Sequence, residues 1–229
     1  MSTTPEIETM SLDEAIYARR SVRGYLDKPV PQEVLNEVFA LAQRTPSNCN
    51  IQPWKVFVAS GEVRDRLREK MIHNVTNGIA PKADVPYPGK FEGEYRKRQV
   101  DCAFEMYGEM GIAREDKEGR MRASLRNFEL FDAPHVAFIG MESTFGTTVG
   151  LDVGMYMQTL MLAMASRGIA SCAQGSMRSY PDLVREEFPG NDNIDILVGM
   201  SFGYEDAEVL ANNTRIDRDP IDASVTFKG

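Results

Sequence analysis

"LDVGMYMQTLMLAMASRG", residues 151–168, is the stretch around which we expect the fold to be built. Its apolar side chains fall on nearly every side of a helix, which predicts a central helix buried on most of its faces. Gly168 is a natural end for this helix, because glycine adopts the left-handed conformation that closes many helices. Methionine fills irregular gaps, so the following residues are assigned to core and dimer packing: Met155, Met157, Met161 and Met164.

Periodic patterns on both sides of this helix predict the remaining elements. The predicted helices are 11–20, 31–45, 62–72, 94–110, 115–130 and 179–188. The predicted strands are 55–60, 135–141, 169–175 and 194–204, with a short one at 224–227 in an otherwise polar tail. Because helices come in runs and strands are scattered among them, the order favours an α+β fold over regular βαβ alternation.

Composition limits both the organisation and the partners of the chain. With 229 residues, 42% of them hydrophobic, we expect one domain over 1–229. Residues 74–93, rich in proline, glycine and aromatic side chains, suit a flap and open a lid insertion at about 74–130. The net charge of −8 argues against a nucleic-acid partner. No signal peptide or membrane span is recognisable, so we expect a cytoplasmic protein without a membrane partner.

Metal and nucleophile chemistry find little support in the sequence. The two histidines, His73 and His135, are far apart and show no HExxH spacing, so no metal is expected. Three cysteines without a Cys-x-x-Cys pair give no disulfide framework. Neither a G-x-S-x-G elbow nor a phosphate-binding glycine motif occurs.

Two polar stretches remain as candidates for a binding site. "ARRSVRGY" (18–25) places three arginines within five positions at the end of a predicted helix, and "PSNCNIQPW" (46–54) is a Ser/Asn loop before a strand. Arginines can hold a phosphate through charge-assisted hydrogen bonds, and amides can contact a heterocycle. This combination indicates a mononucleotide cofactor. Alternatively, the helix dipole alone can favour the arginines, and the loop can be a plain capped turn.

Four ordered motifs give the sequence its strongest resemblance. "RRSVRGY", "PSNCNIQPWKVFVAS", "SCAQGSM" and "GMSFGYED" resemble, in this order, the flavin-dependent nitroreductase family, and the likeness extends from about residue 12 to 227. "YPGKFEGEYRKR" and "LRNFELFDAPH" resemble its nitrobenzoate-reductase-like branch. The resemblance implies a mixed, largely antiparallel central sheet flanked by helices. It also implies a homodimer that binds two FMN molecules at its interface, with each C-terminal tail extending onto the partner.

The resemblance also assigns site residues by position. The expected phosphate and ribityl ligands are Arg19, Arg20, Ser21, Arg23 and Arg218, with Arg215 as the substitute for Arg218. The expected contacts to the flavin ring from the partner are Pro46, Ser47, Asn48 and Asn50, while Gln174 and Gly175 lie near the flavin N5 edge. The substrate-side candidates in the lid are Tyr87, Phe91, Tyr95 and Arg98, although these aromatic side chains can equally anchor the flap.

The implied activity is NAD(P)H-dependent reduction of nitroaromatic compounds by a ping-pong hydride mechanism, in which no side chain need act as acid or base. NADH and NADPH are not distinguished at this stage. A deiodinase-like reductive dehalogenase is the nearest alternative, but its Glu, Tyr and Lys lid trio has no clean match here. A flavin-binding sensor without useful turnover is the third hypothesis.

Overall fold

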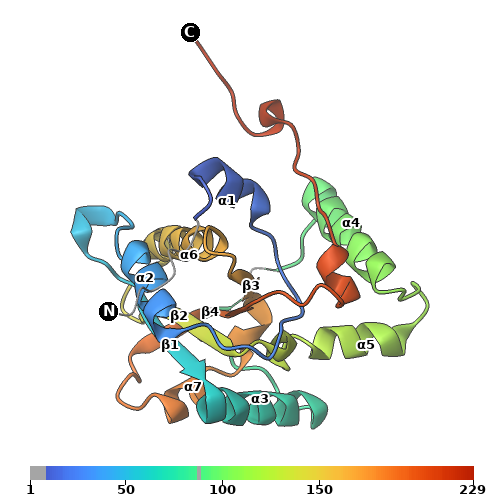
Figure 1. Ribbon diagram of the computed structural model, residues 1–229, viewed down its shortest axis with the longest axis horizontal. Coiled ribbons are helices and arrows are strands. Elements are labelled where there is room, and N and C mark those ends of the chain that lie inside the picture. The colour runs from blue at the N-terminus through green and yellow to red at the C-terminus, as the bar shows by residue number, and fades with distance from the viewer. Residues whose placement is uncertain (1–8, 87–88) are drawn as a thin grey trace, which may run out of the picture.

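The computed structural model describes residues 9–86 and 89–229 and has an α+β fold built on a four-stranded sheet (Figure 1). The strands are β1 (Lys55–Ser60), β2 (His135–Glu142), β3 (Ala170–Gln174) and β4 (Ile194–Gly203). Their order is β1-β2-β4-β3, and all three neighbouring pairs are antiparallel. Within the described ranges, the parallel part of the expected mixed sheet is reduced to one isolated bridge, between Ser21 and Ser171.

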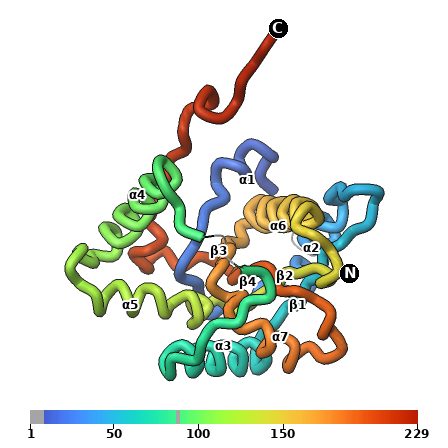
Figure 2. The backbone as a smooth tube through the Cα atoms, turned by 180° about the vertical axis from the view of Figure 1, so that it is seen from behind, coloured from blue at the N-terminus to red at the C-terminus, as the bar shows by residue number. Residues whose placement is uncertain are grey.

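Helices cover both faces of this sheet (Figures 1 and 2). They are α1 (Leu12–Ala18), α2 (Gln32–Ala42), α3 (Gly61–Thr76), α4 (Gly93–Glu109), α5 (Lys117–Leu125), α6 (Gly150–Ala165) and α7 (Pro181–Glu187). The alternation along β2 separates two cores, because neighbouring strand residues face opposite sides. Ala137 and Ile139 pack with α2 and α6, whereas Val136 and Phe138 pack with α3 and α7.

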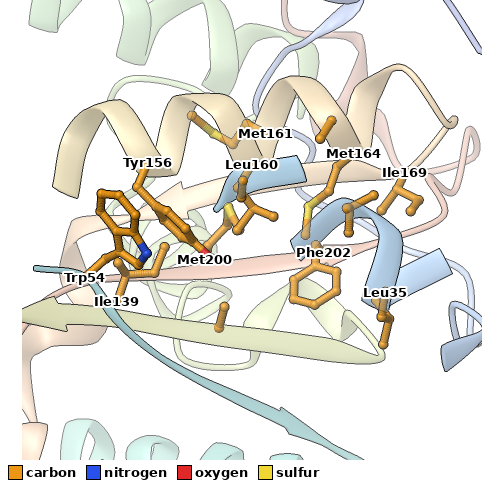
Figure 3. Close-up of a cluster of buried hydrophobic side chains, with 14 of the residues drawn as sticks. Leu35, Trp54, Ile139, Tyr156, Leu160, Met161, Met164, Ile169, Met200 and Phe202 are labelled. Carbon is orange, nitrogen blue, oxygen red and sulfur yellow. The ribbon is translucent and has the colours of Figure 1, made fainter. Parts of the chain in front are cut away.

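Helix α6 is the central helix that its sequence predicts. Tyr156, Leu160 and Met164 are buried beside strand residues in the core of Figure 3. The rings of Tyr156 and Trp54 stack with centroids 4.8 Å apart and planes inclined by 23°. Met155, by contrast, is 42% exposed, so one side of the helix is left open in the single chain.

His135 joins three segments at the start of β2. Its Nε2 accepts the backbone N–H of Val30 at 2.9 Å, so the ring hydrogen lies on Nδ1, which is 2.5 Å from the hydroxyl oxygen of Ser60. Burial, helped by the charge of Arg64, lowers the pKa of His135 below its usual value. The imidazole is therefore a neutral structural tie.

Two sequence-based expectations are wrong. Helix α1 ends at Ala18, so Arg19 and Arg20 lie in extended chain beyond it and do not form its last turn. The reason is a long-range contact, because the backbone N–H of Val22 bonds β3 at Ser171. The short strand expected at 224–227 does not form either. This part of the tail runs away from the body (Figures 1 and 2) and pairs with no strand among the described residues.

None of the helices in the described ranges combines the length and the apolar character that a membrane crossing requires.

Candidate active site

The arginine-rich stretch 19–25 is held beside β3 by its own backbone. Val22 donates its N–H to the carbonyl oxygen of Ser171 at 3.2 Å, and Ser21 bridges the same residue. Successive side chains of extended chain point to opposite sides. Val22 is accordingly buried, whereas Ser21 and Arg23 are half-buried. The alternation places Ser21 and Arg23 on the side opposite to Val22.

The side chain of Tyr25 joins this stretch to strand β4. Its buried hydroxyl lies 2.9 Å from the carbonyl oxygen of Val22 and 3.0 Å from that of Ser201 on β4. Burial raises the pKa of Tyr25 well above its usual value, and the nearby Cys172 raises it further. The hydroxyl therefore keeps its proton and remains a donor.

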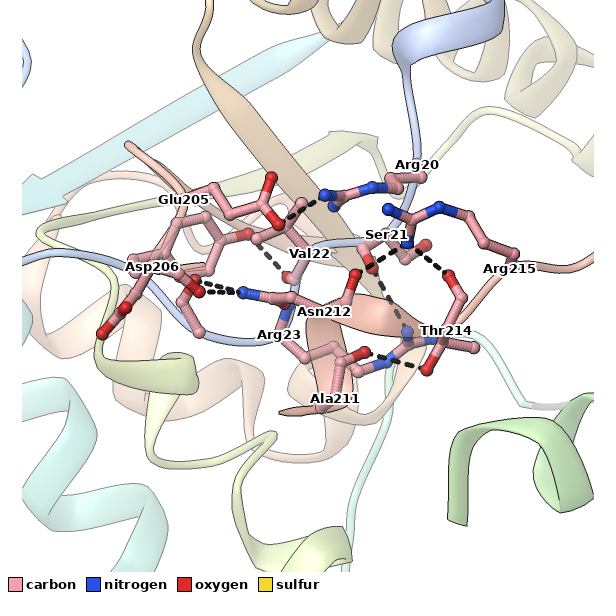
Figure 4. A network of polar contacts seen from close by, with 12 residues as sticks. Arg20, Ser21, Val22, Arg23, Glu205, Asp206, Ala211, Asn212, Thr214 and Arg215 are labelled. Carbon is pink, nitrogen blue, oxygen red and sulfur yellow. Dashed lines mark hydrogen bonds and ion pairs between the residues drawn. The ribbon is translucent and has the colours of Figure 1, made fainter. Parts of the chain in front are cut away.

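Asn212 clamps the stretch from the C-terminal side (Figure 4). This side chain is 2% exposed. Its Oδ1 accepts the backbone N–H of Arg23 at 2.6 Å, and its Nδ2 donates to the carbonyl oxygens of Gly24 at 2.9 Å and Asp206 at 2.8 Å. No local sequence pattern predicts this residue, because its partners on the arginine stretch are 188 and 189 positions away.

Among the described residues, the arginines around this clamp use only some of their hydrogen-bond donors. Arg20 forms an ion pair with Glu205, but its Nη1 is buried and has no hydrogen-bond partner among the described residues. Arg23 donates to the backbone carbonyl oxygen of Ser21 at 3.2 Å. Arg19 and Arg20 line a hollow of about 280 Å³ that adjoins the C-terminal end of α6. Arginine donors therefore gather at this end of α6.

The structure brings Arg215, and not Arg218, to this cluster (Figure 4). Arg215 donates to the carbonyl oxygens of Asn212 at 2.8 Å and Thr214 at 3.0 Å, which places its guanidinium beside the clamp. Arg218 is exposed farther along the tail and bonds the backbone of its own two preceding residues. Sequence reasoning ranked these two arginines in the opposite order.

The end of β3 carries the next two candidates, Gln174 and Gly175. The side chain of Gln174 turns into the core, where its Oε1 contacts the hydroxyl of Ser201 at 2.5 Å and its Nε2 donates to the carbonyl oxygen of Asn127 at 2.8 Å. Gly175, the next residue, is exposed. With Gln174 fixed on both sides, the accessible backbone at Gly175 has a defined position.

The Ser/Asn loop lies at the other end of α6. Asn48 donates its backbone N–H to Asp152, in the first turn of α6, at 3.2 Å, and Ser47 Oγ accepts the backbone N–H of Gln52 at 2.9 Å. Asn50 is left-handed, with φ 56°. Pro46, Asn48 and Asn50 are exposed. Figures 1 and 2 show this loop on the opposite side of the body from the C-terminal segment that carries the clamp.

Of the predicted substrate residues, Tyr95 and Arg98 lie on α4, and Phe91 lies just before it. Arg98 pairs with Asp219 of the tail at 2.5 Å and lies over the ring of Tyr95, with 5.6 Å to the centroid. Tyr95 is 69% exposed and Phe91 39% exposed. Tyr87 lies outside the described residues. Arg98 is thus engaged with the tail and with Tyr95.

The donor set fits the phosphate of a mononucleotide such as FMN. Phosphate oxygens can accept from several arginines and a serine hydroxyl. One of the guanidinium nitrogens, Nη1 of Arg20, has no partner among the described residues. No group of three or more metal-ligating side chains occurs in the part of the chain that the structure describes. The fold and the site together define an α+β protein with a candidate anion-binding site beside the edge strand β3.

Comparison with known proteins identifies the family. The Nitroreductase family model matches residues 16–204. Nitroreductase NfnB of Mycolicibacterium smegmatis is 38% identical over 98% of this chain and 97% of its own length. The 4-nitrobenzoate reductase of Pseudomonas putida is 33% identical over 96% of this chain and 97% of its own. The chain belongs to the nitroreductase family.

Solved structures agree with this assignment. The FMN-dependent nitroreductase NfnB from Mycobacterium smegmatis, in complex with NADPH, has a TM-score of 0.90 at 37% identity and covers 95% of this chain and 97% of its own. The FMN- and NADPH-dependent nitroreductase NfnB from Sphigopyxis sp. strain HMH has a TM-score of 0.92 at 31% identity, covering 96% and 100%. The expected nitroreductase-like fold is thereby confirmed.

Proposed function

We propose that this protein is an FMN- and NADPH-dependent nitroreductase that acts on nitroaromatic compounds. The observation that carries the proposal is the cluster of arginines formed by the stretch 19–25 and Arg215, in a chain of this family. Relatives similar over nearly the whole chain are an FMN-dependent nitroreductase solved with NADPH and a 4-nitrobenzoate reductase. The same chemistry is the simplest use for the site of this chain.

In this proposal the phosphate is held by Arg19, Ser21, Arg23 and Arg215, with the free nitrogen of Arg20 beside them. Asn212 and Tyr25 position these ligands without touching the cofactor. Arg215 is preferred to Arg218 because its guanidinium already lies at the clamp. The summed positive charge of the arginines that hold the phosphate also favours the reduced, anionic form of a flavin.

We further propose a homodimer in which each site is built from both chains. Within one chain the Ser/Asn loop adjoins the N-terminal end of α6 and the arginines adjoin its C-terminal end. A helix of 16 residues separates these ends by about 24 Å, at about 1.5 Å per residue. A two-fold axis that places two α6 helices antiparallel brings the loop of one chain to the arginines of the other.

Exposed apolar side chains support this arrangement. On α6, Leu151 is 68% and Met155 42% exposed. On the neighbouring α1, Leu12, Ile16 and Tyr17 are 66%, 48% and 89% exposed. An apolar surface of this kind is typical of a face that another chain covers. The tail, with Phe227 81% exposed, would then lie against the partner as the family resemblance implies.

The protein contributes position and charge to the reaction. Bound FMN would supply hydride acceptance from the nicotinamide and hydride donation to the nitro compound. Gln174, fixed by Ser201 and Asn127, holds the backbone of Gly175 at the edge where both reactants enter. On the substrate side, Arg98 would exchange its partner Asp219 for a substrate carboxylate, with Tyr87, Phe91 and Tyr95 providing aromatic faces.

An absorbance spectrum of the purified protein, followed by anaerobic addition of NADPH and then of 4-nitrobenzoate, tests the proposal. We expect an oxidised-flavin spectrum that bleaches with NADPH and recovers with the nitro compound. A flavoprotein that no nicotinamide reduces would favour the dehalogenase or sensor hypothesis instead.

The three cysteines are unpaired, which fits a reducing compartment, and we place the reaction in the cytoplasm.

A further inference from the structure

A hollow of about 620 Å³ lies between the segment that follows α3 and the turn that follows β3. Pro81, Lys82 and Pro86 line one side, and Gly175, Ser176 and Arg178 line the other. Gly175 is thus shared between this hollow and the proposed flavin edge. A molecule that approaches the flavin there can extend into the hollow.

The segment that follows α3 is a fixed wall. Lys82 donates its backbone N–H to the carbonyl oxygen of Ser179 at 2.9 Å, and the hydroxyl of Tyr180 donates to the same segment at 2.9 Å. Asp84 accepts from the guanidinium of Arg185 at 2.7 Å and from a backbone N–H of β4 at 2.8 Å. Figure 2 shows the segment crossing β4 before the chain reaches α4. Lys82 is therefore held on the side of the hollow that faces Arg178.

The chemistry of the hollow is that of an anion site. Of its described lining residues, the charged ones are Lys82 and Arg178, both cationic, in a chain whose net charge is −8. Ser176 adds a buried hydroxyl that has no hydrogen-bond partner among the described residues. The nearby carboxylate of Asp84 is already paired with Arg185. An ammonium, a guanidinium and a hydroxyl are donors that suit phosphate oxygens.

We propose that Lys82 and Arg178 bind a phosphate group of the nicotinamide dinucleotide that reduces the flavin. The inference rests on the proposed function, because Gly175 connects the hollow to the flavin only if FMN lies where we place it. A hollow of this volume suits part of a large ligand better than the single carboxylate of a nitrobenzoate. The phosphate is either the diphosphate common to NADH and NADPH or the 2′-phosphate found in NADPH alone.

The test is steady-state kinetics on the FMN-loaded Lys82→Gln and Arg178→Gln variants, with NADPH and NADH as reductants. Each substitution keeps the side chain long and removes its charge. We expect about a tenfold rise in the KM for NADPH, equivalent to about 1.4 kcal/mol. The FMN content and the KM for 4-nitrobenzoate should not change. Lys82→Arg, which keeps the charge, should retain the wild-type KM, and Lys117→Gln on α5 serves as the matched surface control.

The two reductants separate the two sources of phosphate. Equal rises with NADH and NADPH would assign the site to the diphosphate, and a rise with NADPH alone would assign it to the 2′-phosphate. An unchanged KM for both reductants, or a rise confined to 4-nitrobenzoate, would overturn the inference. If the inference fails but the wild-type enzyme is still reduced by NADPH, the proposed function stands. If the wild-type protein binds no FMN, the proposed function itself is refuted.

Discussion

Replacement of Asn212 by alanine should destabilise the protein and weaken FMN binding together. The side chain makes three hydrogen bonds of 2.6, 2.9 and 2.8 Å and is 2% exposed. Its loss removes the partner of the Arg23 backbone N–H, and it leaves the carbonyl oxygens of Gly24 and Asp206 with one backbone N–H each. At a net value of about 1 kcal/mol for each bond, the expected loss is about 3 kcal/mol in the free energy of unfolding.

Urea unfolding of the apoprotein measures this loss, and fluorescence titration with FMN measures the second effect. Since Asn212 fixes the backbone of Arg23, we expect FMN affinity to fall at least tenfold. Asn213→Ala is the matched control, because Asn213 is the exposed neighbour of the clamp. Asn212→Asp should be at least as damaging, because it turns a carboxylate oxygen toward two carbonyl oxygens. If Asn212→Ala stays within about 0.5 kcal/mol of Asn213→Ala, the reasoning is refuted.

Three further predictions concern the phosphate cluster, the core and the interface. Arg215→Ala should raise the Kd for FMN at least tenfold and Arg218→Ala by less than threefold, as measured by fluorescence quenching; the reverse order would restore Arg218 as the ligand. Because folding lowers the pKa of His135, the unfolded chain binds a proton at this residue at a higher pH than the folded protein does. The free energy of unfolding should therefore fall as pH drops below about 6.5. In urea titrations His135→Gln should flatten this slope. Met155→Glu should yield monomers in sedimentation that retain no FMN; monomers with bound FMN would contradict the shared site.

Much of the fold could be predicted from local pattern. The apolar run at 151–168 predicted α6, and the short apolar runs predicted β1 to β4 close to their observed bounds. These predictions succeeded because hydrophobic periodicity follows the faces that become buried. The end of α1 was missed for the opposite reason. A bond between Val22 and Ser171, which are far apart in sequence, decides where that helix stops.

The candidate site could be predicted in its chemistry but not in its geometry. The arginines of the stretch 19–25 stand out in the sequence of an acidic chain. The structure places most of them around Asn212. The clamp residue Asn212 could not be predicted, because its partners Arg23 and Gly24 are 189 and 188 positions away in sequence. Arg218 was ranked above Arg215 by resemblance alone, and local pattern gave no check on that order, since both lie in a tail without periodicity. The tail is placed by tertiary contacts that no local pattern encodes.

The most direct test of the shared site is complementation between two inactive variants. One carries Arg23→Ala and Arg215→Ala and has an intact Ser/Asn loop; the other carries Ser47→Ala and Asn48→Ala and has intact arginines. After the two are unfolded and refolded together, NADPH-dependent reduction of 4-nitrobenzoate is measured. A site built from both chains predicts recovery of about one quarter of wild-type activity, because half of the random dimers each contain one intact site of two. A mixture no more active than its two components would contradict the account.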